Sequence, residues 1–177
     1  MITVKRITEE TKQDILLPNE PFSLWGKMIP LYDGTTWSYR TETFPDEEVS
    51  EMVFPDEDYD FKELKKDHFF VGAYNDDGTC IGLAIYCKGW FRYLYLDDLK
   101  VSKQYRSQGV GRLLLEEGKK IASENGYRGI YTIGQDNNLS ACQFYLHNHF
   151  EIGGFNTNVY RGTSQENKSD IYFYLDC

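Results

Sequence analysis

The sequence predicts a mixed α+β fold built around one sheet that is mostly antiparallel, with a central parallel strand–helix–strand unit and flanking helices. Two observations support this class. Short apolar segments with strand-like alternation, separated by turn residues, fill the first half of the chain. In the second half the order becomes strand, helix, strand, helix, strand, strand. A helix between two strands is the usual crossover of a parallel pair, so that part of the sheet is predicted to be parallel.

The first half holds strands and one short helix. Phe22–Arg40 is rich in aromatic residues and gives no clear assignment. Asp76-Asp77-Gly78 is a turn signal between two apolar runs and predicts a hairpin. The elements expected here are a strand over Ile2–Ile7, a helix over Glu9–Leu17, and the two hairpin strands His68–Asn75 and Thr79–Cys87.

The second half begins after a turn at Lys88-Gly89. Gly126 is placed to end a helix as a C-terminal glycine cap, and Asn137 or Asn138 is placed to cap the start of the next one. The elements expected here are strands over Trp90–Val101, Arg128–Gly134, Phe155–Arg161 and Asp170–Leu175, and helices over Leu113–Asn125 and Leu139–Phe150.

Length and composition indicate one globular domain spanning residues 1–177. No segment approaches the roughly 18 apolar residues of a membrane span, and the first residues lack the apolar run of a signal peptide, so we expect a cytoplasmic protein without a membrane partner. The four cysteines form no C-x-x-C pair, and His147 and His149 would not share a helix face. We therefore expect no metal site.

The chain is acidic, with a net charge of −9 and a pI of about 4.8. Nucleic-acid binding is unexpected, because that affinity comes from neutralising phosphates. Between Glu42 and Asp67 eleven acidic side chains face three lysines, an excess of 11 − 3 = 8 negative charges. This stretch is either a solvated surface or a region that attracts a cationic partner.

The segment Arg106-Ser107-Gln108-Gly109-Val110-Gly111-Arg112 leads from a predicted strand into a predicted helix. A helix start has backbone N–H groups without internal partners, and together with the helix dipole these groups suit an anion such as phosphate. Glycines allow the backbone to approach the ligand, and two arginines add charge at the rim. No Lys-Ser/Thr follows, as in a P-loop, and Leu114 stands where a dinucleotide fingerprint needs its third glycine. The alternative is a plain glycine-rich turn.

The pattern R-x-x-G-x-G of Arg106–Gly111, after a strand ending Leu99-Lys100-Val101, resembles the acetyl-CoA pyrophosphate loop of the GNAT acetyltransferase superfamily. The run Asn138–Tyr145 is similar to the N-x-x-A-x-x-F-Y helix of that superfamily, and FEIGGF resembles the strand that follows it. The resemblance implies a GNAT-like fold and acetyl-CoA as co-substrate. It assigns residues 90–177 to acetyl-CoA binding and residues 1–89 to N-terminal strands and an acidic acceptor region. Members are commonly dimers, so a homodimer is expected.

A narrower resemblance is to streptothricin acetyltransferases. It rests on YLYLDDLKVSKQYRSQGVG, DNNLSACQFY, FEIGGFNTNVYRG and DIYFYLDC. It implies transfer of acetyl to an amino group on the lysine-like arm of this cationic antibiotic, and hence antibiotic resistance. The alternatives are an aminoglycoside, polyamine or protein amine acetyltransferase and, in another class, a CoA-binding sensor without activity.

The resemblance also implies roles for single residues. Asp97 and Asp98 are candidates for the base, or for binding the acceptor's cation. Only one of them can face the cleft if side chains alternate, and Asp97 is slightly preferred. Tyr145 is the candidate acid for the leaving thiolate, since a tyrosine hydroxyl with a reference pKa of about 10 stays protonated at neutral pH; the alternative is a core tyrosine. A backbone N–H of Leu99, Lys100 or Val101 is expected at the developing oxyanion, which needs a bulge or splayed strands. The acetyl-CoA contacts implied are Leu99, Lys100, Val101, Arg106, Ser107, Gln108, Gly109, Val110, Gly111, Arg112, Asn138 and Tyr145.

Overall fold

Strands dominate the computed structural model, which describes residues 1–177. The strands are β1 (Thr3–Arg6), β2 (Phe22–Leu24), β3 (Gly26–Tyr32), β4 (Trp37–Thr43), β5 (Ser50–Met52), β6 (His68–Tyr74), β7 (Cys80–Lys88), β8 (Tyr93–Val101), β9 (Gly129–Gln135), β10 (Glu151–Asn156) and β11 (Asp170–Asp176). The α-helices are α1 (Phe61–Leu64), α2 (Val110–Glu124) and α3 (Leu139–His147), and the 3₁₀ helices are η1 (Glu9–Leu16), η2 (Asp46–Glu48) and η3 (Lys103–Tyr105).

These elements fall into two compact units that do not follow the order of the chain. The first unit holds residues 1–21, 53–130 and Cys177, and the second holds residues 22–52 and 131–176. The region from Glu42 to Asp67 is therefore shared between the two units.

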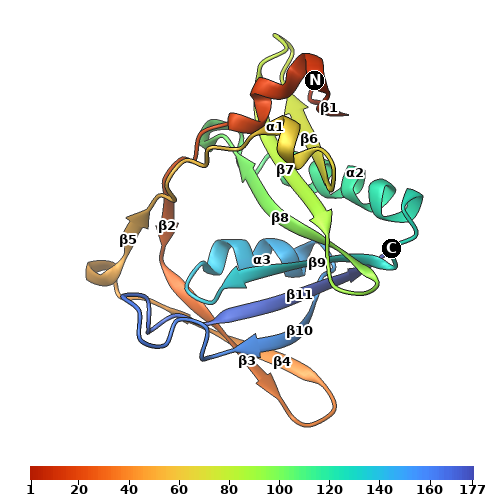
Figure 1. Ribbon diagram of the computed structural model, residues 1–177. Coiled ribbons are helices and arrows are strands. Elements are labelled where there is room, and N and C mark those ends of the chain that lie inside the picture. The colour runs from red at the N-terminus through yellow and green to blue at the C-terminus, as the bar shows by residue number, and fades with distance from the viewer. The chain divides into compact units, whose positions relative to one another are not determined.

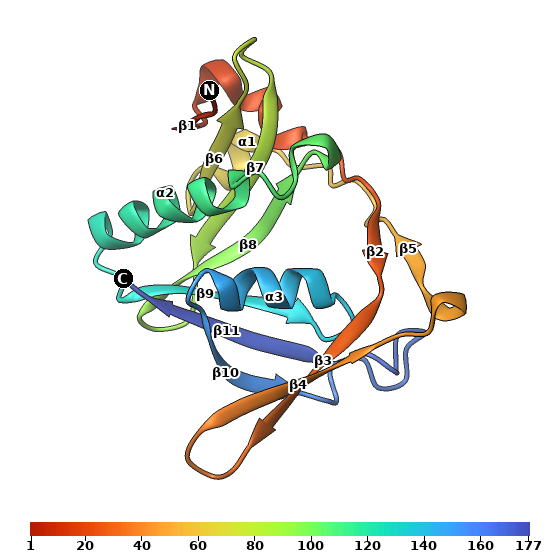
Figure 2. The ribbon, with the colours of Figure 1, turned by 180° about the vertical axis from the view of Figure 1, so that it is seen from behind.

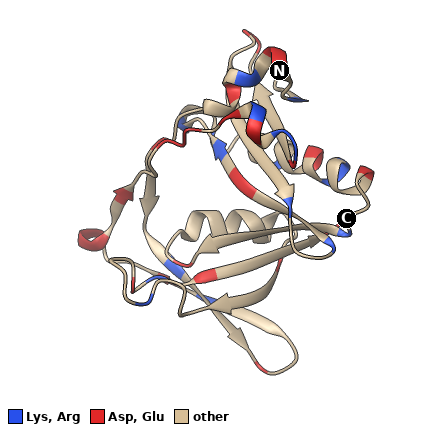
Figure 3. Cartoon of the chain, in the orientation of Figure 1, with Lys and Arg blue, Asp and Glu red and all other residues tan.

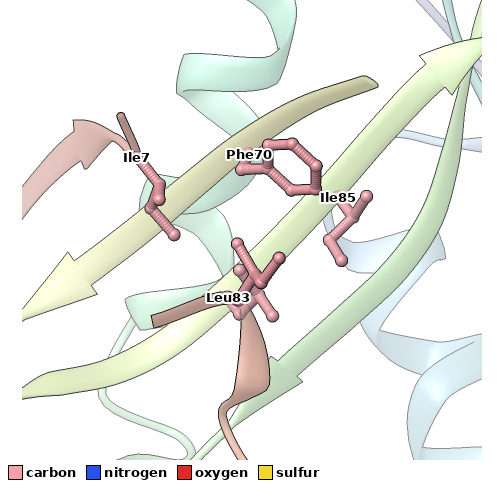
Figure 4. Packing of buried hydrophobic residues seen from close by; sticks show 5 residues of the cluster. Ile7, Phe70, Leu83 and Ile85 are labelled. Atoms are coloured by element: carbon pink, nitrogen blue, oxygen red, sulfur yellow. The ribbon is translucent and has the colours of Figure 1, made fainter. Parts of the chain in front are cut away.

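The first unit contains the strands β1, β6, β7 and β8 in that order, each antiparallel to its neighbour. Helix α2 lies across β6, β7 and β8 (Figure 1). Against these strands also packs a buried cluster of five apolar side chains, four of which are labelled in Figure 4. The cluster consists of Ile7, Ile15, Phe70, Leu83 and Ile85. Burial of this apolar surface holds η1 and the segment before β6 onto the strands.

Helix α2 packs closely on β7 because it carries a glycine at the contact. A Cβ on Gly118 would lie 2.3 Å from the ring of Tyr86, and the Tyr86 hydroxyl donates to the Leu114 carbonyl at 3.0 Å. The helix ends as predicted at Gly126, which has a φ of +74°. The N–H of Gly126 donates to the Ser123 carbonyl, and the N–H of Tyr127 donates to the Ala122 carbonyl. These are the two hydrogen bonds of a glycine C-cap.

The strands on either side of α2 start next to each other. The Arg128 N–H, just before β9, donates to the Arg92 carbonyl, just before β8, at 2.7 Å. This contact, within the first unit, lies at the point where the helix connection returns the chain to the start of β9.

The second unit contains most of β9, followed in order by β11 and β10, with β10 and β11 antiparallel. Two further antiparallel pairs are β3 with β4 and β2 with β5. Helix α3 runs along β9 and β11 (Figure 2). A Cβ on Gly134 in β9 would lie 3.2 Å from Phe173 and 3.7 Å from Tyr145, so this glycine lets the helix and the strands approach each other.

The mixed, mostly antiparallel α+β class is confirmed, and several predicted boundaries are wrong. The predicted helix at Leu113 starts at Val110, and the one predicted to reach Phe150 ends at His147. The strand predicted over Phe155–Arg161 runs instead from Glu151 to Asn156, because its pairing with β11 ends at Asn156. The residues left unassigned from Phe22 onward form β2, β3 and the start of β4. No helix is long and apolar enough to cross a membrane.

Candidate active site

The acidic pair predicted on the strand before the loop lies in the middle of β8, visible as a red band in Figure 3. The pairing of β8 with β7 shifts here: Ile85 faces Asp98 while Tyr86 faces Leu96, so Asp97 has no partner residue. This is a β-bulge, with one extra residue in β8. The expectation that only one carboxylate faces the cleft assumed that successive side chains alternate between the two faces of the strand. The bulge interrupts this alternation at Asp97.

The carboxylate of Asp98 is engaged within the first unit. Its Oδ2 atom lies 3.1 Å from Nζ of Lys100 and accepts a hydrogen bond of 3.2 Å from the hydroxyl of Tyr59. Burial raises the pKa of Asp98, and the Lys100 ammonium offsets this only in part. Lys100 also pairs with Glu57 at 2.7 Å.

The carboxylate of Asp97 is exposed and has no hydrogen-bond or ion-pair partner in the chain. Partial desolvation by the surrounding protein raises its pKa, His68 lowers it, and the Glu57 carboxylate raises it. The two acids of the pair therefore differ: Asp98 is held by neighbours, while Asp97 is free to accept a proton or a cation.

The turn between β8 and α2 has the backbone geometry that the glycines predicted. Ser107 and Gly109 have positive φ values of 60° and 83°. A Cβ on Gly109 would meet no atom within 4 Å, so the glycine is needed for its dihedral angle and leaves open space above the helix start. Gln108 closes the turn by donating from Nε2 to the Gln104 carbonyl at 2.7 Å.

The first turn of α2 is left without a side-chain cap. Gly109 is the N-cap residue, so the N–H groups of the first helical residues lack an intrahelical partner. Val110 is buried in this turn, and its Cγ1 would lie 3.0 Å from a Cβ on Gly82 of β7, which fixes the turn on the strand. Gly111 is half-exposed, and Arg112 is exposed with no carboxylate pairing with it.

The Arg106 side chain makes three hydrogen bonds to main-chain carbonyls. Its Nε donates to the Val101 carbonyl at 2.9 Å, and its two terminal nitrogens donate to the carbonyls of Pro21 at 2.7 Å and Glu20 at 3.3 Å. The guanidinium therefore ties the loop after β8 to residues 20–21. Of the two arginines expected at the rim, Arg112 is the one whose charge is unengaged.

Asn138 and Tyr145 lie on α3 in the second unit. Asn138 is the N-cap, and its Oδ1 accepts from the Ala141 N–H at 3.2 Å, which decides between the two predicted caps. Tyr145 is buried, with its ring centroid 5.2 Å from that of Phe173 and 5.3 Å from that of Phe150. These aromatic neighbours fix the orientation of the Tyr145 ring.

Sequence reasoning missed Tyr59 and Glu57, which join the acidic pair from about 40 positions away along the chain. It treated them only as members of an acidic stretch, and no local pattern marks them. It also gave Asn137 no role beyond a possible cap, yet the Asn137 Oδ1 atom is buried without a hydrogen-bond partner. No group of three or more His, Cys, Asp or Glu side chains is arranged to hold a metal ion.

The chain belongs to the acetyltransferase (GNAT) family, whose sequence model matches residues 32–150. Enzymes of this family transfer acetyl from acetyl-CoA to an amine, so the chain is an acyl-CoA-dependent N-acetyltransferase and acetyl-CoA is its co-substrate.

Among relatives, streptothricin acetyltransferase A of Bacillus subtilis (strain 168) is 32% identical over 171 residues, 97% of this chain and 98% of that protein. A crystal structure from Bacillus anthracis str. Ames, described as a streptothricin acetyltransferase in complex with acetyl coenzyme A, has a TM-score of 0.87 and 26% identity and covers 100% of both chains. A nourseothricin acetyltransferase structure, with a TM-score of 0.79 and 23% identity over 99% of this chain and 98% of that one, shares the fold.

Proposed function

We propose that this enzyme acetylates streptothricin on an amino group of its lysine-like arm and so confers resistance to the antibiotic. The observation that carries the proposal is the free carboxylate of Asp97, next to a second acid in β8, in a chain 32% identical over 97% of its length to a streptothricin acetyltransferase. A free carboxylate at this position suits an acceptor whose reacting group is an ammonium ion.

The pyrophosphate of acetyl-CoA is assigned to the start of α2, with the main-chain N–H groups of Gly109, Val110, Gly111 and Arg112 as donors. The uncapped first turn and the open space above Gly109 support this fit. Backbone N–H groups at a helix start, together with the helix dipole, favour a phosphate group. The side chain of Arg112 adds positive charge there, while Arg106 holds the shape of the loop.

The reaction forms one C–N bond and breaks one C–S bond. A lysine-like ammonium has a pKa of about 10.4 and must lose a proton before its nitrogen attacks the thioester carbonyl. Asp97 takes that proton, directly or through one water molecule, since its carboxylate is unpaired and its pKa is raised towards the working range of a base. The carbonyl oxygen becomes negative as the amine adds.

Main-chain donors near the bulge stabilise that oxygen in our proposal. The bulge interrupts the ladder at Asp97, while Leu99, Lys100 and Val101 keep their register with β7, so the proposed donor is an N–H of these three residues that points away from β7. When the tetrahedral species collapses, the thiolate of coenzyme A leaves and takes a proton. Tyr145 is proposed as the donor of that proton, supported by its place in the N-x-x-A-x-x-F-Y pattern and by its fixed ring.

The dependence on salt is the first prediction. The net charge of −9 and the acids of the first unit around β8 attract a cationic acceptor over distances at which dissolved ions screen the field. We expect kcat/KM for streptothricin to fall clearly as ionic strength rises from low to physiological values. Steady-state kinetics in graded salt measure this, with the KM for acetyl-CoA followed in parallel. A flat response would assign the acidic stretch to solvated surface alone.

The function itself is tested by incubating the protein with acetyl-CoA and streptothricin and analysing the antibiotic by mass spectrometry. The expected product carries one added acetyl group on the lysine-like arm, with release of one free thiol. An aminoglycoside, a polyamine and a lysine-containing peptide serve as competing acceptors. If one of these acceptors is acetylated faster than streptothricin, that acceptor and not streptothricin is the substrate. Thermal stabilisation by acetyl-CoA without thiol release on any amine would indicate an inactive CoA-binding sensor.

A further inference from the structure

A buried ammonium group lies beside the acidic pair of β8. The side chain of Lys100 is 9% exposed, and its Nζ lies 2.7 Å from Oε2 of Glu57 and 3.1 Å from Oδ2 of Asp98. A buried charge is stable only when it is paired and hydrogen-bonded. Lys100 therefore depends on both carboxylates, and both carboxylates have their counter-charge in Lys100.

Tyr59 contacts both Asp98 and Lys100 of this charged group. Its hydroxyl donates to Asp98 at 3.2 Å, and its ring centroid lies 6.0 Å from Nζ of Lys100. The body of the side chain packs against the apolar cluster that includes Phe70 and Ile85, drawn in Figure 4. Burial, followed by the neighbouring carboxylates, raises the pKa of Tyr59 well above its ordinary value, so the hydroxyl keeps its proton and donates it in the hydrogen bond to Asp98.

Glu57 is fixed by two donors. Oε2 accepts from Lys100 and, at 3.0 Å, from Nδ2 of Asn19. Burial acts to raise the pKa of Glu57, but the hydrogen bonds from Lys100 and Asn19 outweigh it and the pKa is lowered. Glu57 is therefore a negative charge near β8, held in place by Lys100 and Asn19.

The charges in this group do not balance. Glu57, Asp97 and Asp98 bring three carboxylates to this region, and the one ammonium of Lys100 pairs with two of them, Glu57 and Asp98. Asp97 is left exposed and unpaired at the bulge. The group therefore keeps a negative charge that is accessible to solvent, and a cationic acceptor can pair with it.

We propose that Lys100, Tyr59 and Glu57 are positioning residues: they close Asp98 into an ion-pair network and leave Asp97 as the carboxylate that meets the acceptor's ammonium group. The proposal rests on the proposed function, because it specifies how the same site selects its acceptor. Lys100 in this network acts through its side chain, in addition to any main-chain contact with acetyl-CoA.

Besides desolvation, two groups act on the pKa of Asp97: His68 at the start of β6 lowers it, and Glu57 on the segment before α1 raises it. Asp97 in turn raises the pKa of Tyr59 on that segment and of Cys87 near the end of β7, while Asp98 and Lys100 lie on β8 with it. Among these, Glu57 raises the pKa of both Asp97 and Asp98. Removing one member of the Lys100–Glu57 pair therefore has an electrostatic effect opposite in sign to removing the other.

The test compares Glu57→Gln with Lys100→Met in the pH dependence of kcat/KM. The base must be ionised, so activity is present above its pKa and lost as pH falls through it. Glu57→Gln removes a negative charge, and we expect the acidic limb to move to lower pH by about 0.5–1 unit. Lys100→Met leaves two carboxylates uncompensated, and we expect the limb to move to higher pH by about 1 unit. If the two residues had a purely structural role, the acidic limb would shift in the same direction in both variants or would not shift in either.

Glu124→Gln is the matched control, because it makes the same chemical change in the same unit and breaks only the pair with Arg6. Its acidic limb is expected to stay at the wild-type pH. If Lys100→Met fails to fold, Tyr59→Phe replaces it: the ring still fills its place, and losing the hydrogen bond to Asp98 raises the pKa of Asp98. Shifts of equal sign in Glu57→Gln and Lys100→Met, or a wild-type titration of Asp98 in Tyr59→Phe, would overturn the proposal.

A carboxyl-resolved NMR titration of the unliganded protein separates this inference from the proposed function. It reads the pKa values of Asp97 and Asp98 in each variant without any acceptor. Opposite shifts of Asp97 in the two variants support the network even if streptothricin is not the substrate. Absence of those shifts rejects the network even if streptothricin is acetylated.

Discussion

Replacing Tyr145 with phenylalanine is expected to lower kcat by about 10²- to 10⁴-fold, the usual contribution of a positioned acid or base. The ring packs against Phe144, Phe150 and Phe173, and phenylalanine preserves those contacts, so the fold should persist. Only the hydroxyl that is proposed to protonate the leaving thiolate is lost. Binding of acetyl-CoA should therefore remain near the wild-type level.

Pre-steady-state thiol release and calorimetric titration of acetyl-CoA measure the two quantities separately. Tyr172→Phe is the matched control. It removes a tyrosine hydroxyl from β11 in the same unit and leaves the residues of α3 unchanged. Its kcat should equal that of the wild type. An unchanged kcat in Tyr145→Phe would remove Tyr145 as the acid and leave it as a core tyrosine.

The second large effect is expected from Asp97→Asn, which should lower kcat/KM for streptothricin by about 10²- to 10⁴-fold. Asparagine has nearly the same shape and cannot take a proton. Asp97 is exposed and makes no hydrogen bond or ion pair, so its replacement should leave the free energy of unfolding almost unchanged. The part of the acidic limb that titrates with Asp97 should disappear, leaving only the rise of activity with pH that follows deprotonation of the acceptor's own ammonium group.

Asp98→Asn is the informative comparison for this variant. It weakens the network with Lys100 and Tyr59, so a moderate rise in KM for the acceptor is expected, but the acidic limb should persist. Kinetics of both variants between pH 5 and 9, with chemical denaturation as a folding check, provide the measurement. A lost limb in Asp98→Asn together with a retained limb in Asp97→Asn would assign the base to Asp98 instead.

Local signals in the sequence predicted much of the first unit. The hairpin of β6 and β7 follows from alternating apolar residues around Asp-Asp-Gly, and the end of α2 follows from Gly126. The glycine turn before α2 was also predictable, because Gly109 occupies a positive φ that few other residues adopt. The helix start was placed too late because Gly111 and Arg112 look like loop residues, although they form the first helical turn.

The features that depend on tertiary contacts were not predictable. The bulge at Asp97 results from pairing with β7 and has no mark in the order of residues on β8. The three carbonyl contacts of Arg106 include two with residues 20–21, which a motif comparison does not consider. The strand expected over Phe155–Arg161 was placed too late, because the extent of β10 is set by its pairing with β11; the FEIGGF segment, identified by resemblance, covers most of it.

In the candidate site, too, local sequence patterns identified some residues, and tertiary contacts alone identified the others. The acids on β8 were found because two of them stand side by side before the loop, and Asn138 and Tyr145 because they belong to a motif. The network partners Glu57 and Tyr59 lie about 40 positions from Asp98 and Lys100 in sequence, within a stretch where acidic residues are common. Only the folded contacts distinguish these two from their neighbours.

Binding of the acetyl-CoA diphosphate by main-chain donors at the start of α2 underlies the roles proposed for all the other side chains. Amide-resolved NMR spectra of the protein, recorded during titration with acetyl-CoA, test it most directly. We predict that the N–H resonances of Gly109, Val110, Gly111 and Arg112 shift together and saturate with the calorimetric dissociation constant. Saturating acetyl-CoA that leaves these four resonances unmoved would contradict the claim.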